Sequence, residues 1–222
     1  TYGCTDSLTK SMKVHPQPNA IIASVNACLN DQVAVYDSSV VDTSNIVNWV
    51  WDMGTGDTLY NQNNNYLYTT FGTKTITLIV VSNDQCRDTT SSNVRVYELP
   101  TANFEFQDTC EYEQLLVTST SSEGDTTISV YEWNFGDLSA SQFGTSQLHT
   151  YATNAIDPVL LTVTDRFGCE NDTTQNVEIF EQPDVAFHFE EVCDKDSVFF
   201  VDQTSYDSAS LYNTARWEWD FD

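Results

Sequence analysis

Apolar and polar residues alternate in short runs along the whole chain. The first of these runs are "AIIASV", "QVAVYD", "NWVWDM", "KTITLIVV" and "SNVRVYE", separated by turn-rich stretches such as "GTGD" and "NQNNN". A period of two residues predicts β-strands of about six residues, and helical periodicity is absent throughout. Strands at this spacing predict an all-β fold made of antiparallel, immunoglobulin-like sandwiches.

The pattern repeats along the chain. The six cysteines are separated by gaps of 24 residues that alternate with gaps of 58 or 59, and they stand at Cys4, Cys28, Cys86, Cys110, Cys169 and Cys193. Three prolines, Pro18, Pro100 and Pro183, follow the same period. Fixed spacing of this kind indicates tandem units of about 82 residues.

The three prolines also predict the boundaries of the units. Each ends a run with strand-like alternation, such as "NVRVYELP" and "NVEIFEQP". Proline cannot donate a hydrogen bond to a sheet, so it marks the end of a strand. We therefore expect the last hairpin of a preceding unit at residues 1–17, complete units at 18–99 and 100–182, and the first part of a truncated unit at 183–222. No flexible linker separates them, so the units are expected to follow one another end to end.

A Trp-containing phrase carries a resemblance to a known family. "WDMGTGD" and "WNFGD", followed by "NYLYTTFGTKTITLIVV" and "QLHTYATNAIDPVLLTVTDRFGC", resemble the polycystic kidney disease (PKD) domain pattern. The sequence departs from it at Met53, at Asn134 and at Tyr66, which stands where the second unit has His149. The cysteine-containing type is similar to PKD arrays in secreted and cell-surface proteins of the Bacteroidota.

We expect the phrase to have a structural role. Its residues are Trp51, Asp52, Gly54, Trp133, Gly136, Asp137 and Trp219. A tryptophan in the third strand of such a sandwich is commonly the centre of the core, so all three tryptophans are expected to be buried. The glycines suit a sharp turn, and Asp57 and Asp137 can accept backbone N–H groups there. A catalytic pair of carboxylates is the weaker alternative.

Charge narrows the possible partners. The chain has 8 Lys and Arg against 33 Asp and Glu, a formal charge of −25. Such a field repels phosphate backbones, so nucleic acid is not expected as a partner. The sequence contains no run of 18 apolar residues, so it predicts no membrane span. The first ten residues do not have the pattern of a signal peptide.

The sequence predicts no catalytic residues and no metal ligands. The three histidines occupy non-equivalent positions of the repeat, and neither a zinc-type cysteine spacing nor a Gly-X-Ser-X-Gly motif occurs. No cofactor is expected. Calcium is the alternative, in loops that contain Asp37, Asp42 and Asp207, although these loops do not have regular ligand spacing.

Tyrosines offer an alternative binding function. The stretch "LYNQNNNYLY" places Tyr60, Tyr66 and Tyr68 among amides, where they could bind a polysaccharide. Packing within the fold explains these residues equally well, and we favour it.

The cysteines predict disulfides and an extracellular location. One pairing lies within the units, Cys28 with Cys86 and Cys110 with Cys169. The other joins Cys28 to Cys169, because a Greek-key sandwich places the two cysteines of one unit at opposite ends. Under this second pairing, Cys86 and Cys4 would bond to units before residue 1. Cys110 and Cys193 would then bond to units after residue 222.

Triplets that consist of Asp, then Ser or Thr, then a residue such as Leu or Thr resemble the O-glycosylation pattern of the Bacteroidota. The acceptors that this resemblance implies are Ser7, Thr58, Thr89, Thr126, Thr173, Ser197 and Ser208. The same dipeptides are common in turns.

These observations favour a non-catalytic structural segment of an extracellular surface protein, an adhesin stalk or filament. Its expected partners are adjacent repeats, and other surface proteins, copies of itself or polysaccharide are further candidates. The alternative is an accessory spacer or carbohydrate-binding array of a secreted hydrolase or protease.

Overall fold

The computed structural model describes residues 2–3, 5–205 and 217–221. Within these ranges all regular secondary structure is β-strand, which confirms the all-β prediction. The chain divides into two compact units, residues 1–99 and 100–222, and each is described by itself. The finer division into four segments, with boundaries at 17, 99 and 182, stays a prediction.

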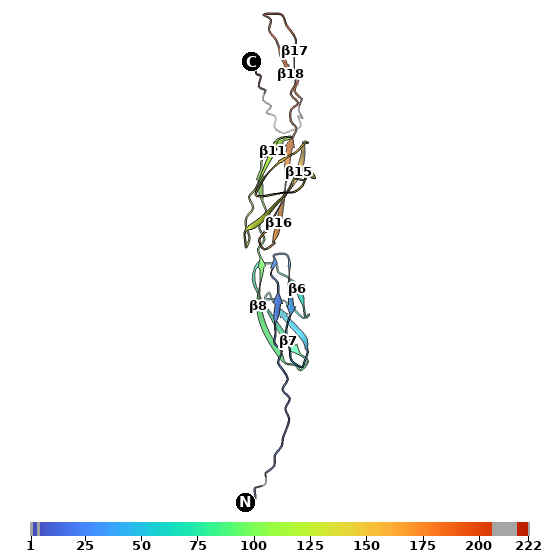
Figure 1. Ribbon diagram of the computed structural model, residues 1–222, viewed down its shortest axis with the longest axis vertical. Coiled ribbons are helices and arrows are strands. Elements are labelled where there is room, and N and C mark those ends of the chain that lie inside the picture. The colour runs from blue at the N-terminus through green and yellow to red at the C-terminus, as the bar shows by residue number, and fades with distance from the viewer. Residues whose placement is uncertain (1, 4, 206–216, 222) are drawn as a thin grey trace. The chain divides into compact units, whose positions relative to one another are not determined.

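Unit one is a sandwich of two sheets (Figure 1). The larger sheet has the order β2-β8-β7-β4-β5, formed by β2 (Ala27–Cys28), β8 (Arg87–Tyr97), β7 (Gly72–Ser82), β4 (Ile46–Asp52) and β5 (Thr58–Leu59). The smaller has the order β1-β3-β6, formed by β1 (Ile22–Ser24), β3 (Gln32–Asp37) and β6 (Asn64–Leu67). The chain enters the unit through residues 2–3 and 5–17, which form no strand, although a hairpin was expected there. Its last residue contacts unit one, where Gln17 Nε2 donates to the backbone oxygen of Arg87 at 3.1 Å.

The long strand β7 supplies much of the core of unit one. Its alternate side chains Ile76, Leu78 and Val80 are fully buried, as the period of two in "TITLIVV" predicts. They pack in one cluster with Trp51 of β4 and Val35 of β3. The two sheets are therefore held together by apolar side chains that alternate with solvent-facing ones.

Unit two repeats this architecture between residues 100 and 180. Its larger sheet has the order β10-β16-β15-β12-β13, formed by β10 (Thr109–Cys110), β16 (Glu170–Phe180), β15 (Ala155–Asp165), β12 (Ile128–Asn134) and β13 (Gln142–Phe143). The smaller sheet has the order β14-β11-β9, formed by β14 (Ser146–Thr150), β11 (Gln114–Ser119) and β9 (Phe104–Phe106). Figure 1 shows β15 and β16 as the long pair that corresponds to β7 and β8. The core again centres on a tryptophan, Trp133.

Residues 184–205 repeat only the first hairpin of the sandwiches. β17 (Phe187–Phe189) and β18 (Phe200–Asp202) pair antiparallel, as β9 pairs with β11 and β1 with β3. The isolated bridge between Asp184 and Ser205 corresponds to the bridge between Thr101 and Ser122 of unit two. The third copy of the repeat therefore starts in the same register as the first two.

The turn that follows each buried tryptophan admits only glycine. Gly136 has a φ of +78°, and a Cβ atom there would lie 2.8 Å from the backbone oxygen of Pro158. Gly54 has a φ of +72°, and its Cβ would lie 2.5 Å from the backbone oxygen of Thr75. Both glycines are thus required by the backbone conformation and by the close approach of β15 or β7.

We predict that Gly136→Ala destabilises unit two by about 2 kcal/mol more than Gly168→Ala. Gly168 also has a positive φ, +84°, but an added Cβ would meet nothing within 4 Å. The control therefore contains only the cost of the left-handed conformation, about 1–2 kcal/mol. The free energy of unfolding can be measured by hydrogen exchange of β15 and β16 peptides in increasing urea. Equal losses for the two variants would contradict the close contact.

Candidate functional site

The tryptophans of the repeated phrase are core residues in both complete units. Trp51 and Trp133 have no exposed surface. Each indole N–H donates to a backbone carbonyl, that of Asn61 at 3.0 Å and that of Gly144 at 2.8 Å. The only polar atom of each side chain is satisfied inside the fold, as a buried tryptophan requires.

The residue after each tryptophan fixes the turn. The Oδ1 atoms of Asp52 and Asn134 accept the backbone N–H of Gly54 and Gly136, at 2.8 and 2.9 Å. Aspartate and asparagine carry this acceptor oxygen equally. The departure at Asn134 is therefore conservative for the turn, and no catalytic carboxylate is needed to explain Asp52.

Tyr68 and Tyr151 connect the same turn to the core. Their hydroxyls donate to the backbone oxygens of Met53 at 2.9 Å and Phe135 at 2.8 Å. A backbone acceptor makes the hydrogen bond independent of whether Met or Phe occupies the position. Burial raises the pKa of Tyr68 to about 12. With 2% of its surface exposed, Tyr68 cannot stack on a sugar, so the suggested polysaccharide role is wrong for this residue.

In unit two an aspartate and a histidine form a polar pair beside the turn. His149 Nε2 lies 2.8 Å from Asp137 Oδ2, and the imidazole stacks on Phe135 with a centroid distance of 4.0 Å. The other ring nitrogen faces the Gln142 amide at 3.5 Å, rather than a serine or cysteine nucleophile. Asp137 also accepts the backbone N–H of Ser139 at 3.0 Å, the turn role predicted from the sequence.

Unit one replaces this pair by tyrosine and aspartate. The Tyr66 hydroxyl donates to Asp57, and Thr55 Oγ1 is within hydrogen-bonding distance of both side chains. This hydrogen bond to Asp57 is the main reason that the pKa of Tyr66 is raised. Sequence reasoning did not predict either pair. The signal was the shared position of Tyr66 and His149, each two residues before the buried tyrosine.

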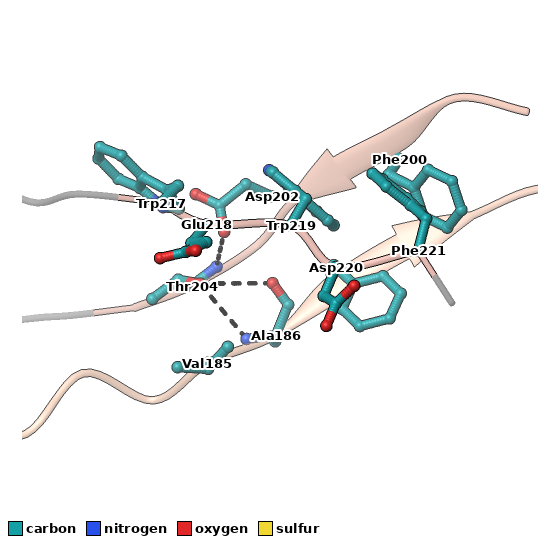
Figure 2. Close-up of a pocket in the computed structure, with 11 residues that line it drawn as sticks. Val185, Ala186, Phe200, Asp202, Thr204, Trp217, Glu218, Trp219, Asp220 and Phe221 are labelled. Atoms are coloured by element: carbon teal, nitrogen blue, oxygen red, sulfur yellow. Dashed lines mark hydrogen bonds between the residues drawn. The ribbon is translucent and has the colours of Figure 1, made fainter.

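A groove lined by aromatic and acidic side chains is formed by residues 185–204 and 217–221 (Figure 2). Phe187 meets Trp219 edge to face at 5.6 Å and 76°, close to the 5.2 Å and 79° of Phe104 and Trp133 in unit two. Asp202 accepts the backbone N–H of Thr204 at 3.0 Å. The groove thus repeats core geometry that is closed in the complete units.

Trp219 is the exception to the predicted burial of the tryptophans. It is 40% exposed, whereas Trp51 and Trp133 are fully buried. Trp51 pairs with Leu78 of β7 and Trp133 with Leu161 of β15. Among residues 184–205 and 217–221 no strand corresponds to β7 or β15, so one face of Trp219 lies open.

The cysteines of a unit occupy opposite ends of its last strand. Cys28 lies opposite Tyr97 at the end of β8, whereas Cys86 precedes Arg87 at its start. An eleven-residue strand spans roughly 33 Å, and a disulfide requires Cα atoms within about 7 Å. The pairing of Cys28 with Cys86 is therefore excluded by the register of unit one.

Unit two excludes its internal pairing in the same way. Cys110 lies opposite Phe180 at the end of β16, and Cys169 precedes Glu170 at the start of that strand. Cys28 and Cys169 are both disulfide-bonded. Of the other described cysteines, Cys86, Cys110 and Cys193 are free thiols.

Of the aspartates in the suggested calcium loops, Asp37 has another hydrogen-bonding role. Asp37 accepts the indole N–H of Trp49 at 2.7 Å and the backbone N–H of Ser39 at 2.9 Å. Asp207 lies outside the described residues, and Asp42 is exposed. In the part of the chain that the structure describes, no group of three or more His, Cys, Asp or Glu is placed to hold a metal ion.

The suggested glycosylation sites differ in exposure. Thr89 is exposed and lies opposite Ile79, while Thr173 is half-buried and lies opposite the buried Leu161. Ser7, Thr58 and Ser197 are exposed and Thr126 is half-buried. Ser208 lies outside the described residues. Occupancy at these positions stays a prediction, and Thr173 is less accessible than Thr89, its counterpart in unit one.

Comparison with known families identifies the repeat. A family model described as the PKD domain matches residues 13–96 and again residues 97–180. The chain belongs to the PKD domain family. Tandem PKD domains are structural repeats of an extracellular type and are generally non-catalytic modules. Across the described ranges, no helix is long and apolar enough to cross a membrane.

Solved structures of PKD and related β-sandwich domains are similar to the chain. The PKD1 domain of Vibrio anguillarum Epp shares 23% identity over 37% of this chain and 96% of that chain, with a TM-score of 0.36. The PKD1 domain of the Vibrio cholerae metalloprotease PrtV shares 26% over 37% and 98%, with a TM-score of 0.34. Fibronectin(III)-like modules of Clostridium thermocellum CbhA share 11% over 72% and 95%, with a TM-score of 0.39. Comparison with curated proteins gives no match.

We predict that Asp137→Asn reduces the loss of stability of unit two in acid. Burial raises the pKa of Asp137, but hydrogen bonds from Ser139 and His149 outweigh it, so the pKa is lowered overall. A carboxyl group whose pKa is lower in the folded state than in the unfolded state stabilises the fold when it is ionised. This stabilisation is fully present above the pKa of the unfolded state, about 3.9, and is lost as the pH falls through the pKa of the folded state. Unfolding of unit two measured from pH 7 to pH 2 checks this slope.

Asp157→Asn is expected to act in the opposite direction. Burial, followed by the nearby Asp137, raises the pKa of Asp157, so its ionised form opposes folding at pH 7. Asp157→Asn should therefore stabilise unit two at pH 7, with the gain shrinking as the pH falls to about 3.9. A loss of stability at pH 7 would show that Asp157 has a structural partner.

Proposed function

We propose that this chain is a non-catalytic structural segment of an extracellular surface protein, giving length and stiffness to an adhesin stalk or filament. The observation that supports this most is the direct succession of two complete sandwiches. β8 ends at Tyr97, and the first bridge of unit two already involves Thr101. Each unit has its own apolar core, so neither depends on the other to fold.

A disulfide from Cys28 to Cys169 would add stiffness between the units. The chain leaves unit one at Tyr97, the residue opposite Cys28. It enters unit two at Pro100, whose carbonyl accepts a hydrogen bond from Asn171 at 2.8 Å, two residues after Cys169. The two cysteines therefore stand where the chain leaves one unit and enters the next, and only a few residues separate these points.

Non-reducing peptide mapping should recover a Cys28–Cys169 peptide pair. Recovery of Cys28 linked to Cys86 would overturn the pairing. Cys28→Ser should also broaden the distribution of molecular dimensions measured by small-angle X-ray scattering, because the units lose a covalent restraint. Cys86→Ser is the matched control and should leave the scattering unchanged. Equal scattering for both variants would remove the proposed contribution to stiffness.

The alternative, a carbohydrate-binding array of a secreted hydrolase or protease, predicts a different result. It needs exposed aromatic rings, and Tyr60 is the remaining exposed member of the tyrosine cluster in unit one. Polysaccharide binding by the whole chain that is abolished by Tyr60→Ala would favour this alternative. If the chain does not bind polysaccharide even at a millimolar concentration of sugar repeating units, the result would favour the structural role.

A further inference from the structure

The first cysteine of each repeat stands in the same local structure. Cys28 and Cys110 each belong to a two-residue strand that pairs parallel with the last strand of the unit. The carbonyl oxygen of each accepts the N–H three residues later, at 3.0 Å from Asp31 and 3.2 Å from Glu113. The residue just before that donor, Asn30 in unit one and Tyr112 in unit two, has a positive φ. We call Cys28 and Cys110 the exit cysteines, because the chain leaves each unit beside them.

The second cysteine of each repeat also has a recurring setting. Cys86 and Cys169 lie in the hairpin between the two long strands, where their carbonyls accept the backbone N–H of Ser82 at 2.9 Å and of Asp165 at 3.0 Å. Their own N–H groups donate to the side chains of the same two residues, at 3.2 and 2.9 Å. We call Cys86 and Cys169 the entry cysteines, because the chain enters each unit beside them.

One cysteine of each kind is already oxidised. The exit cysteine Cys28 and the entry cysteine Cys169 are disulfide-bonded, whereas Cys110 and Cys86 occupy equivalent turns and are free. The register of β8 and β16 keeps the exit and entry cysteines of one unit too far apart to bond. Each free thiol therefore has the geometry of a bonded one and no possible partner within its own unit.

We propose that Cys110 is a disulfide site for the entry cysteine of a further PKD unit placed directly after residue 182, and that Cys86 is the reciprocal site for an exit cysteine placed before residue 18. This inference rests on the Cys28–Cys169 pairing of the proposed function. The partner is defined by its chemistry: a cysteine thiol at the end of a β-hairpin, with an Asp or Ser four residues before it. Every unit would then be linked covalently to both neighbours.

The bond forms by thiol–disulfide exchange. Two cysteine thiols lose two protons and two electrons as the S–S bond forms, and a small disulfide such as oxidised glutathione accepts them and is cleaved to two thiols. No group within the protein has to act as the oxidant.

The test adds one unit to the full chain. A second copy of residues 100–182 is inserted between Gln182 and Pro183, so that the new junction reproduces the one at Leu99–Pro100. The inserted copy carries Cys110→Ser, which leaves a single exit cysteine at that position, and Glu170→Asp as a mass label. After folding in a glutathione redox buffer, the disulfides are mapped without reduction.

The expected result is a peptide pair that joins Cys110 to the mass-labelled entry cysteine. Alkylation of Cys110 by iodoacetamide should fall at least tenfold relative to the chain of 222 residues. In the matched control the inserted copy also carries Cys169→Ser, and Cys110 should again be fully alkylated. Full alkylation of Cys110 beside an inserted unit that is protected in hydrogen exchange would overturn the proposal.

A reciprocal variant guards against an inserted unit that does not fold. A copy of residues 18–99 placed before Pro18 supplies an exit cysteine, which should bond to Cys86. Loss of the Cys28–Cys169 pair itself would contradict the proposed function, whereas a retained pair with free Cys110 and Cys86 would contradict only this inference.

Discussion

The packing of one tryptophan against a long β-hairpin determines the rest of each unit. Trp51 and Trp133 lie opposite Leu78 and Leu161, and the buried side chains of these hairpins close the space between the two sheets. Residues 185–205 and 217–221 show similar aromatic geometry around Trp219, and no such hairpin lies within these two ranges. There the tryptophan is partly exposed. The first hairpin therefore sets the positions of the aromatic rings, and the long hairpin excludes water from them.

Much of the fold could be predicted because the sequence shows both the repeat and the alternation of apolar and polar residues that is typical of strands. The alternation in "TITLIVV" gave the buried face of β7, and the spacing of cysteines and prolines gave the length of the units. The exposure of Trp219 was not predictable in this way, since burial depends on strands that lie elsewhere in the fold. The alternation of apolar and polar residues indicates which side chains can form a core. Whether they do so depends on the presence of the strand that covers them.

The turn after the tryptophan could be predicted only in part. Its glycines and its acceptor side chains follow from local chemistry, which is why Asp52 and Asn134 serve equally well. The pairing of Asp137 with His149, and of Asp57 with Tyr66, joins a residue of the turn to a residue on a strand of the smaller sheet. It became visible only from the structure. Different side chains provide the same hydrogen bond in the two units, so the site supports the turn and no single reactive group is maintained.

The length of the last strand also determines what the cysteines can do. β8 and β16 each have eleven residues, so they hold the two cysteines of a unit at opposite ends. A shorter strand would have allowed a bond inside the unit, which would stabilise one sandwich and leave its neighbours unlinked. Because the cysteines stand where the chain enters and leaves each unit, the bonds that we propose for them run to neighbouring units. The strand that completes the core therefore also determines that the disulfides can act on the array and not on the single domain.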